Sequence, residues 1–141
     1  MTSPVQTNKR VAVIGAGAAG LCAAKYLLAR GAEVVVYELG SYVGGLWVYN
    51  NDSGMSPAYK SLHINSEASV SNLADFPFPD DAPLYPDHAE MSRYFARYAD
   101  HFDLTRRIRF KARVKQITPT QGAFRIELED GAVESFDGAV V

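Results

Sequence analysis

Three glycines near the start of the chain have the spacing of a phosphate-binding turn. Gly15, Gly17 and Gly20 follow an apolar run that ends at Ile14, and an apolar stretch with helical spacing comes after them. The first glycine permits the turn, the second lets a pyrophosphate approach the backbone, and the third lets the helix pack close to the strand. The N–H groups and dipole of the first helical turn then favour an anion. We therefore predict that this segment binds the pyrophosphate of a dinucleotide through Gly15, Gly17, Ala18, Ala19 and Gly20.

A carboxylate after the next apolar run narrows the identity of the dinucleotide. Glu38 follows the apolar run at residues 33–37 and lies 18 residues after Gly20. This is near the spacing at which an acid accepts hydrogen bonds from an adenosine ribose. A carboxylate suits a free 2′-hydroxyl and repels a 2′-phosphate, so FAD or NAD is favoured over NADP. The alternative is a glycine-rich turn followed by a surface glutamate.

The elements that must position these residues form a β-α-β unit. We predict a strand over residues 9–14, a helix over residues 21–30 that ends at Gly31, and a parallel strand over residues 33–37. Residues 39–86 lack a periodic pattern but are rich in glycine, proline and aromatic residues. Such a composition favours an ordered loop around a ligand over a disordered linker.

The second half of the chain predicts one helix and several short strands. Asp87 is the expected N-cap of a helix that ends near Phe102, with Glu90 as its capping partner. Strands are then predicted over residues 108–110, 113–118, 123–129, 133–136 and 138–141. Residues 119–122 and the Asp130-Gly131 pair supply turns between them.

The predicted fold class is α/β. We expect a Rossmann-like FAD-binding domain with a parallel sheet, together with a three-stranded antiparallel meander. Residues 1–9 are expected to be an N-terminal tail and residues 10–141 the domain. Since the strand that begins at Gly138 meets the end of the sequence, we expect the domain to be truncated there, as a segment of a longer protein.

Composition narrows the class of protein further. The 141 residues are 48% hydrophobic with a net charge of −2, which does not favour binding to nucleic acid or to an anionic membrane. No apolar stretch is long enough to span a bilayer, and no cluster of His, Cys, Asp and Glu has metal-ligand spacing. The single cysteine, Cys22, excludes an internal disulfide and suits a reducing compartment, so a cytoplasmic location is predicted. Basic residues that alternate with apolar ones between Arg106 and Lys115 predict a solvated strand face.

Three further segments carry a resemblance to a known family. Gly44-Gly45-Leu46-Trp47, Asn65 and Asp75-Phe76-Pro77-Phe78-Pro79, added to the glycine motif, make the chain similar to the flavin-containing monooxygenases. The resemblance runs from Arg10 to Val141. It implies a flavin that NADPH reduces and that reacts with O₂, giving a C4a-(hydro)peroxyflavin that oxygenates soft nitrogen or sulfur nucleophiles.

The resemblance also implies roles for individual residues. Asn65 would be catalytic at the flavin edge, although a loop-capping asparagine is the alternative. Trp47 would contact the flavin or be a core aromatic, and His63 would touch the flavin or be structural. Val114 would offer its backbone to the adenine. The full predicted cofactor-binding set is Gly15, Gly17, Ala18, Ala19, Gly20, Glu38, Leu39, Gly45, Leu46, Trp47, His63, Asn65 and Val114, with the NADPH site mostly outside this chain.

Other functions remain open from the sequence. The chain could belong to another two-nucleotide flavoprotein, such as a Baeyer–Villiger monooxygenase or an amine oxidase, or be a non-catalytic nucleotide-binding module. The expected partners are a small-molecule substrate and O₂, and a homo-oligomer is left open. Because the chain lacks the second nucleotide motif, we expect it to be inactive alone.

Overall fold

Alternating side chains on two parallel strands define the layers of the fold. The computed structural model describes residues 8–141, so most of the predicted N-terminal tail lies outside the described residues. In β1 (Arg10–Ile14), Val11 and Val13 face a helical layer, whereas Ala12 faces the opposite side of the sheet. In β2 (Glu33–Tyr37) the valines at 34 and 36 face the helices, and Tyr37 faces away from them. The parallel sheet therefore buries both faces, as parallel sheets generally do.

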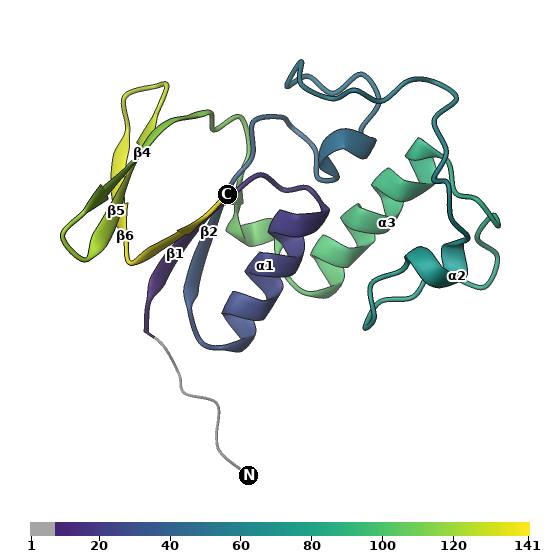
Figure 1. Ribbon diagram of the computed structural model, residues 1–141, viewed down its shortest axis with the longest axis horizontal. Helices are drawn as coiled ribbons and strands as arrows, with labels where there is room; N and C mark the ends of the chain where they lie inside the picture. The colour runs from purple at the N-terminus through teal and green to yellow at the C-terminus, as the bar shows by residue number, and fades with distance from the viewer. Residues whose placement is uncertain (1–7) are drawn as a thin grey trace, which may run out of the picture.

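The strands form two separate sheets (Figure 1). The parallel sheet has the order β3-β2-β1-β7, with β3 (Ile108–Arg109) and β7 (Gly138–Val140) at its edges. The antiparallel sheet has the order β4-β5-β6 and consists of β4 (Val114–Thr120), β5 (Ala123–Leu128) and β6 (Val133–Phe136). Ile126, Leu128 and Phe136 pack on the face of the parallel sheet that the helices leave free. The predicted combination of a parallel sheet and an antiparallel meander is confirmed.

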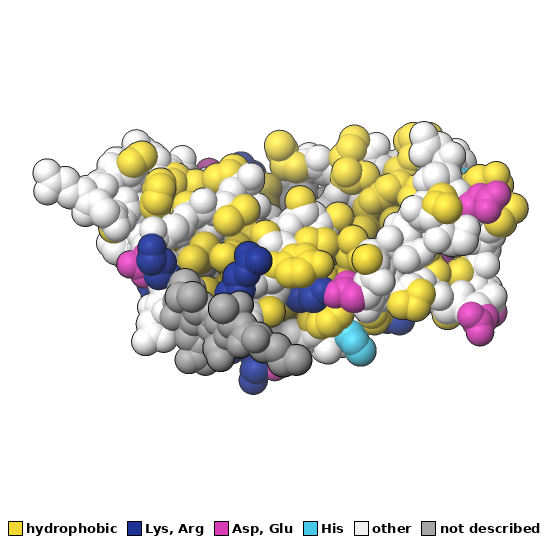
Figure 2. Space-filling model, turned by 60° about the horizontal axis from the view of Figure 1, so that its bottom comes forward, with side chains coloured by type: hydrophobic (Ala, Val, Ile, Leu, Met, Phe, Trp, Pro, Cys, Tyr) yellow, Lys and Arg dark blue, Asp and Glu magenta, His cyan; other side chains and the backbone are white. Residues whose placement is uncertain are grey.

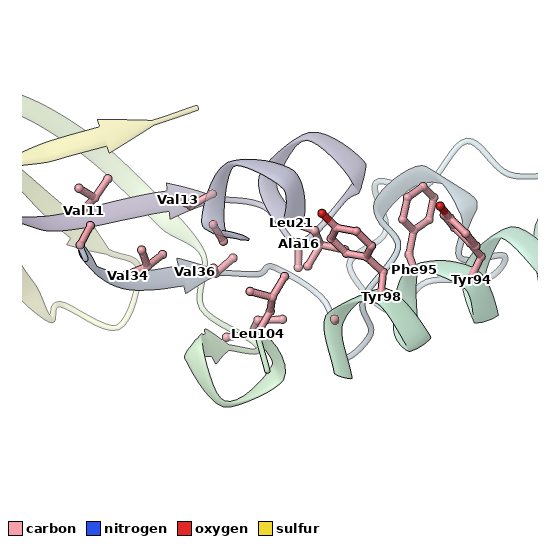
Figure 3. Packing of buried hydrophobic residues seen from close by; sticks show 14 of the residues in the cluster. Val11, Val13, Ala16, Leu21, Val34, Val36, Tyr94, Phe95, Tyr98 and Leu104 are labelled. Atoms are coloured by element: carbon pink, nitrogen blue, oxygen red, sulfur yellow. The ribbon is translucent and has the colours of Figure 1, made fainter. Parts of the chain in front are cut away.

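Helix α1 (Ala18–Ala29) packs on the other face of the parallel sheet, and α3 (His88–His101) packs beside it in the same buried cluster. Leu21 of α1 and Tyr98 of α3 belong to the same buried cluster as the valines of β1 and β2 (Figure 3). Leu104, just after α3, is fully buried in this cluster. This packing holds the N-terminus of α1 against the carboxyl end of β1.

The first helix begins earlier than predicted. It starts at Ala18 instead of Leu21, so the last glycine of the motif lies within its first turn. The apolar stripe used for the prediction begins at Leu21 and gives no signal for this turn. The consequence is that the backbone N–H groups of residues 18–20 belong to the helix N-terminus.

The start of α3 agrees with the prediction in part. The Asp87 carboxylate accepts a hydrogen bond from the Glu90 N–H at 2.8 Å, as an N-cap does. The Glu90 side chain does not close the predicted reciprocal cap. It pairs instead with Arg93 and Arg97, one and two turns further along the helix.

Several other boundaries differ from the sequence prediction. The fourth strand continues through Pro119 and Thr120, which were predicted to be in a turn; as the edge of its sheet, β4 tolerates a proline. Two short helical turns, η1 (Gly45–Trp47) and α2 (Ala68–Ser71), interrupt the long irregular stretch. A third turn, η2 (Thr105–Arg107), precedes β3.

The predicted basic strand face is wrong. The basic residues lie on η2, β3, a turn and β4, because β3 is only two residues long. Several of them pair with acids: Arg106 with Asp103, Lys111 with Asp52, and Lys115 with Glu127. Arg107 does not pair with an acid among residues 8–141, and its Nε is buried there without a hydrogen-bond partner. Figure 2 shows Lys and Arg side chains scattered round a hydrophobic centre on one face of the molecule.

Residues 8–141 contain neither a membrane-spanning helix nor a cluster of metal-ligand side chains. Among residues 8–141, no helix has the length and apolarity needed to cross a bilayer. Over the same residues, His, Cys, Asp and Glu side chains form no group of three or more that could hold a metal ion. Cys22 is half-buried on α1 and packs against the helical core, 3.9 Å from the Tyr98 hydroxyl.

Candidate functional site

Two glycine turns meet at the N-terminus of α1. Gly15 adopts a φ of +95°, which glycine accommodates without strain, and a Cβ on Gly20 would lie 1.9 Å from the Gly15 carbonyl oxygen. The second turn contains Gly45, whose Cβ position lies 3.0 Å from the Gly17 Cα. The Gly44 N–H donates to the Ala16 carbonyl at 3.0 Å. The two backbones therefore approach each other closely, and no side chain stands between them and the helix end.

The N-terminus of α1 offers unpaired hydrogen-bond donors. Its N-cap is Gly17, which makes no side-chain cap, and the first turn contains no acid. The first intrahelical bond runs from the Leu21 N–H to the Gly17 carbonyl, so the N–H groups of Ala18, Ala19 and Gly20 precede it. Uncapped donors at the positive end of the helix dipole suit a phosphate.

Glu38 is held at the end of β2 by the backbone. Its side chain is 5% exposed, and its two oxygens accept hydrogen bonds from Ala16 N–H and Gly40 N–H, each at 2.7 Å. A carboxylate has about four acceptor positions, so it can still accept bonds from ligand hydroxyls. Glu38 thus links the glycine turn to β2 and presents a fixed acceptor beside it.

A cleft of about 370 Å³ opens at the carboxyl ends of β1 and β2. This is where open parallel sheets bind ligands, next to the strand at which the chain order reverses. Its floor contains Ile14 and Tyr37, and its walls come from the segment after β2 and from the start of β4. The predicted residues that line it are Gly15, Glu38, Leu39, Gly45, Leu46 and Val114.

The other predicted residues lie outside this cleft. Gly17, Ala18, Ala19 and Gly20 form the adjoining helix end, and Trp47 is half-buried against the helical core. His63 and Asn65 are exposed on a loop that pairs with the start of α3. In that loop the Ile64 N–H donates to the Pro86 carbonyl at 2.9 Å, and His63 forms a bridge with Asp87. The structure therefore does not bring Asn65 into the lining of the cleft.

A charged cluster fixes the meander against the parallel sheet. Glu134 of β6 accepts hydrogen bonds from Arg10 on β1 (2.6 Å), from the Tyr37 hydroxyl on β2 (2.9 Å), and from Arg109 on β3. Burial raises the pKa of Glu134, but these donors outweigh it and hold the pKa at about 2. Burial and the bond to Glu134 raise the pKa of Tyr37 to about 12. Tyr37 and Val114 both line the cleft. The charged cluster therefore fixes the antiparallel sheet, which begins at Val114, relative to the strand that carries Tyr37.

Aromatic packing anchors the Asp-Phe-Pro-Phe-Pro segment to the helices. The Phe76 ring contacts Tyr94 and Tyr98 of α3, with centroids 5.4 Å and 5.5 Å away, and the Tyr94 hydroxyl donates to the Phe76 carbonyl. Asp75 pairs with Lys25 of α1. This segment therefore joins α1 to α3 on the helical side.

Some cleft residues were missed by the sequence reasoning. They are Ile14 and Tyr37 in the floor, Asn51, Ser53, Met55 and Ser56 in one wall, and Ala112 and Arg113 in the other. The Asn-Asp-Ser-Gly run at 51–54 signals a turn. No local pattern signals that this turn faces residues 112–113, which are about sixty positions away.

Comparison with known proteins gives a consistent set of relatives. The model of the family described as flavin-binding monooxygenase-like matches residues 8–125. Flavin-containing monooxygenase 1 of Homo sapiens is 40% identical over 112 residues, which cover 78% of this chain and 21% of the relative.

Two solved structures share the arrangement. S-allyl-L-cysteine S-oxygenase from Allium sativum has a TM-score of 0.86 at 28% identity, covering 96% of this chain and 36% of that one. An oxidised steroid monooxygenase bound to NADP has a TM-score of 0.77 at 28% identity, covering 90% of this chain and 24% of that one. The chain thus spans about a fifth to a third of the length of these proteins, and the family resemblance drawn from the motifs is confirmed.

Proposed function

The chain belongs to the flavin-binding monooxygenase-like family, and from this premise we propose that it forms the FAD-binding segment of an NADPH- and O₂-dependent monooxygenase. The observation that carries the proposal is the cleft at the ends of β1 and β2, next to an uncapped helix N-terminus. When bound and reduced, FAD supplies the reaction with O₂. The residues of this chain bind the cofactor and orient it.

The ADP half of FAD fits the cleft and the helix end. The N–H groups of Ala18, Ala19 and Gly20 would donate to the pyrophosphate, whose approach needs the bare Cα atoms of Gly17 and Gly45. The fixed carboxylate of Glu38 would accept bonds from the ribose hydroxyls. Val114, which lines the cleft at the start of β4, would offer its backbone to the adenine.

The flavin half would extend from the helix end toward η1 and α3. Gly45 and Leu46 line the cleft on that side, and η1 packs on α3 beside Ser92. The exposed loop with His63 and Asn65 pairs with the residues that open the same helix. We propose Asn65 as the catalytic residue, because its amide can donate to the flavin edge and accept from the nicotinamide.

The proposed substrates are soft nucleophiles that carry sulfur or nitrogen. The name of the Allium sativum protein describes an S-oxygenase, which favours a thioether over a ketone. Ketone oxygenation, as in a Baeyer–Villiger monooxygenase, is the second candidate. The steroid monooxygenase neighbour is bound to NADP, which supports NADPH as the reductant. A protein that turns over a ketone and leaves a thioether unchanged would select the second candidate.

The activity is tested on a protein of the relatives' length that carries this chain. We expect it to purify with bound FAD and to consume NADPH and O₂ when a thioether such as methyl phenyl sulfide is added. The chain alone is expected to bind FAD without oxidising NADPH. A protein of that length that purifies without flavin and does not take up added FAD would contradict the proposal.

Replacement of Asn65 by leucine tests its proposed role. Asn65→Leu should leave FAD affinity unchanged, because the side chain lies outside the cleft that holds the ADP half. The ratio of oxygenated product to H₂O₂ should fall about tenfold or more, as expected when a hydrogen-bond donor at the reacting group is removed. Both products are measured in the same NADPH assay.

The matched control is Glu67→Gln, a change at an exposed residue two positions further along. This variant should keep the product ratio of the unmodified protein. An unchanged ratio in Asn65→Leu would remove Asn65 from the catalytic assignment.

The predicted cytoplasmic location, and a homo-oligomeric assembly, remain predictions to be tested separately.

A further inference from the structure

One ion pair joins the two walls of the cleft. Asp52 lies between the lining residues Asn51 and Ser53, and Lys111 directly precedes the lining residue Ala112 on the opposite wall. Their side chains form an ion pair, and both are partly exposed (37% for Asp52 and 57% for Lys111). The pair therefore lies at the rim of the cleft and not within its floor.

The wall that contains Asp52 is a short segment fixed at its ends. We call residues 51–56 the strap. Asp52 also accepts a hydrogen bond from the Ser41 N–H at 2.9 Å, and at the other end the Ser56 hydroxyl donates to the Leu46 carbonyl at 2.9 Å. Between them the Gly54 N–H donates to the Asn51 carbonyl at 3.1 Å. The strap is thus a defined turn that is hydrogen-bonded to the segment after β2 and to η1.

The two walls also meet at one glycine. The Gly40 carbonyl accepts from the Lys111 N–H at 3.1 Å, and a Cβ on Gly40 would lie 2.4 Å from the Asn51 side-chain oxygen. Gly40 therefore lets the strap approach the turn before β4. The Lys111 ammonium and Ser41 hold the pKa of Asp52 at about 2, so the carboxylate is charged at neutral pH.

Apolar side chains at the rim have no cover. Met55 of the strap is 71% exposed and Leu46 is 51% exposed, yet both line the cleft. A planar base placed in the cleft would cover part of this surface, and burial of apolar surface favours binding. Lys111 precedes the segment that ends at Val114, where the adenine is proposed to bind, so the ion pair borders the adenosine end of the ligand.

We propose that the strap crosses the adenosine end of the bound dinucleotide, and that the Lys111–Asp52 pair latches it and slows dissociation. The inference rests on the proposed function, since it assumes that the cleft holds the ADP half of FAD. Asp52 and Lys111 would then be positioning residues, which contact each other at the rim of the cleft where the ligand leaves. Neither residue takes part in the chemistry.

The test measures the rate at which FAD leaves a protein of the relatives' length that carries this chain. Asp52→Asn removes the charge but keeps an oxygen for the Ser41 N–H, and Lys111→Gln removes the opposite charge. Each should raise the FAD dissociation rate about two- to fivefold, the size expected for one exposed ion pair. The increase should shrink in 1 M NaCl, where such pairs are screened. Flavin fluorescence reports the rate.

Controls separate the latch from general effects. Glu127→Gln breaks the exposed Lys115–Glu127 pair between β4 and β5, outside the cleft, and should leave the rate unchanged. FMN lacks the adenosine, so its dissociation should be the same in all variants. Thermal unfolding midpoints within the error of the unmodified chain would exclude a folding defect.

The outcomes distinguish this inference from the function on which it rests. If the unmodified protein of that length does not bind FAD, the proposed function and the latch both fail. If FAD binds, and its dissociation rate from Asp52→Asn and from Lys111→Gln equals that of the unmodified protein, only the latch is overturned. A rate increase that FMN or Glu127→Gln shares would overturn it as well, because the effect would not act through the adenosine end.

Discussion

Two glycines of the same motif have different physical roles. Gly20 is needed by the fold, because a Cβ there would lie 1.9 Å from the backbone oxygen of Gly15. Gly17 is not, because a Cβ there would lie 3.6 Å from the Cα of Gly45, an ordinary contact. The Gly17 site instead borders the helix end at which a phosphate is expected. The packing role that the motif assigns to the third glycine is thus confirmed, whereas the role of the second stays a prediction.

This difference predicts that one alanine variant mainly loses stability and the other mainly loses FAD affinity. Gly20→Ala should lower the free energy of unfolding by about 2–3 kcal/mol, because strand and helix must move apart. Gly17→Ala should cost less than about 1 kcal/mol in stability. It should nevertheless weaken FAD binding at least about tenfold, since its Cβ stands where the phosphate meets the backbone. Denaturant unfolding and FAD titration measure the two effects.

Gly138→Ala is a suitable control for both variants. Its Cβ would meet only Val11 side-chain atoms at 3.6 Å and 3.7 Å, and its φ is not positive. It should change stability little and leave FAD affinity unchanged. A Gly17→Ala chain that binds FAD as tightly as the unmodified chain would contradict the placement of the pyrophosphate.

At the level of elements, Glu134 connects the antiparallel sheet to the parallel one. It accepts bonds from Arg10, Tyr37 and Arg109, which lie on three different strands. The pKa of Glu134 is about 2 in the folded chain, whereas an unfolded glutamate titrates near 4.3. Because the folded pKa is the lower one, the stabilisation is fully present above about pH 4.3 and is lost as the pH falls toward 2.

Glu134→Gln should therefore alter acid unfolding. The variant should lose about 1 kcal/mol of stability at pH 7, a modest value because the site is partly solvated. Between pH 5 and pH 2 its stability should fall less steeply than that of the unmodified chain. Denaturant unfolding at several pH values measures both changes.

The control for this prediction is Glu129→Gln. Glu129 is exposed and faces one partner, Arg113, at 3.4 Å. Its replacement should leave the acid dependence almost unchanged. If Glu134→Gln and the unmodified chain lose stability in parallel below pH 5, the charged cluster does not hold the two sheets together.

At the level of the whole molecule, local signals predicted the elements and long-range contacts escaped prediction. Apolar alternation, the glycine motif and the Asp87 cap each act within a few residues, and the corresponding elements are present. The pairing of Asp52 with Lys111 joins residues 59 positions apart and has no local signature. For the same reason the basic residues between Arg106 and Lys115 were predicted to form a strand face, although Arg109 and Lys111 pair with acids that are distant in the sequence.

The candidate site divides in the same way. Glycine and acid spacing predicted the part of the cleft made by β1, α1 and β2, where the geometry follows from one β-α-β unit. The second wall depends on how residues 38–87, between β2 and α3, return to the cleft, and sequence periodicity does not describe this path. Asn65 lies on that returning stretch, so its role rests on the family and awaits its own test.

Titration of the 141-residue chain with FAD, followed by isothermal calorimetry, tests the ADP-binding cleft most directly. We expect one FAD per chain, with affinity lost in Gly17→Ala and much weaker binding of FMN, which lacks the adenosine half. A chain that folds but releases no heat with FAD, or that binds FMN and FAD equally, would contradict an ADP-binding cleft at the ends of β1 and β2.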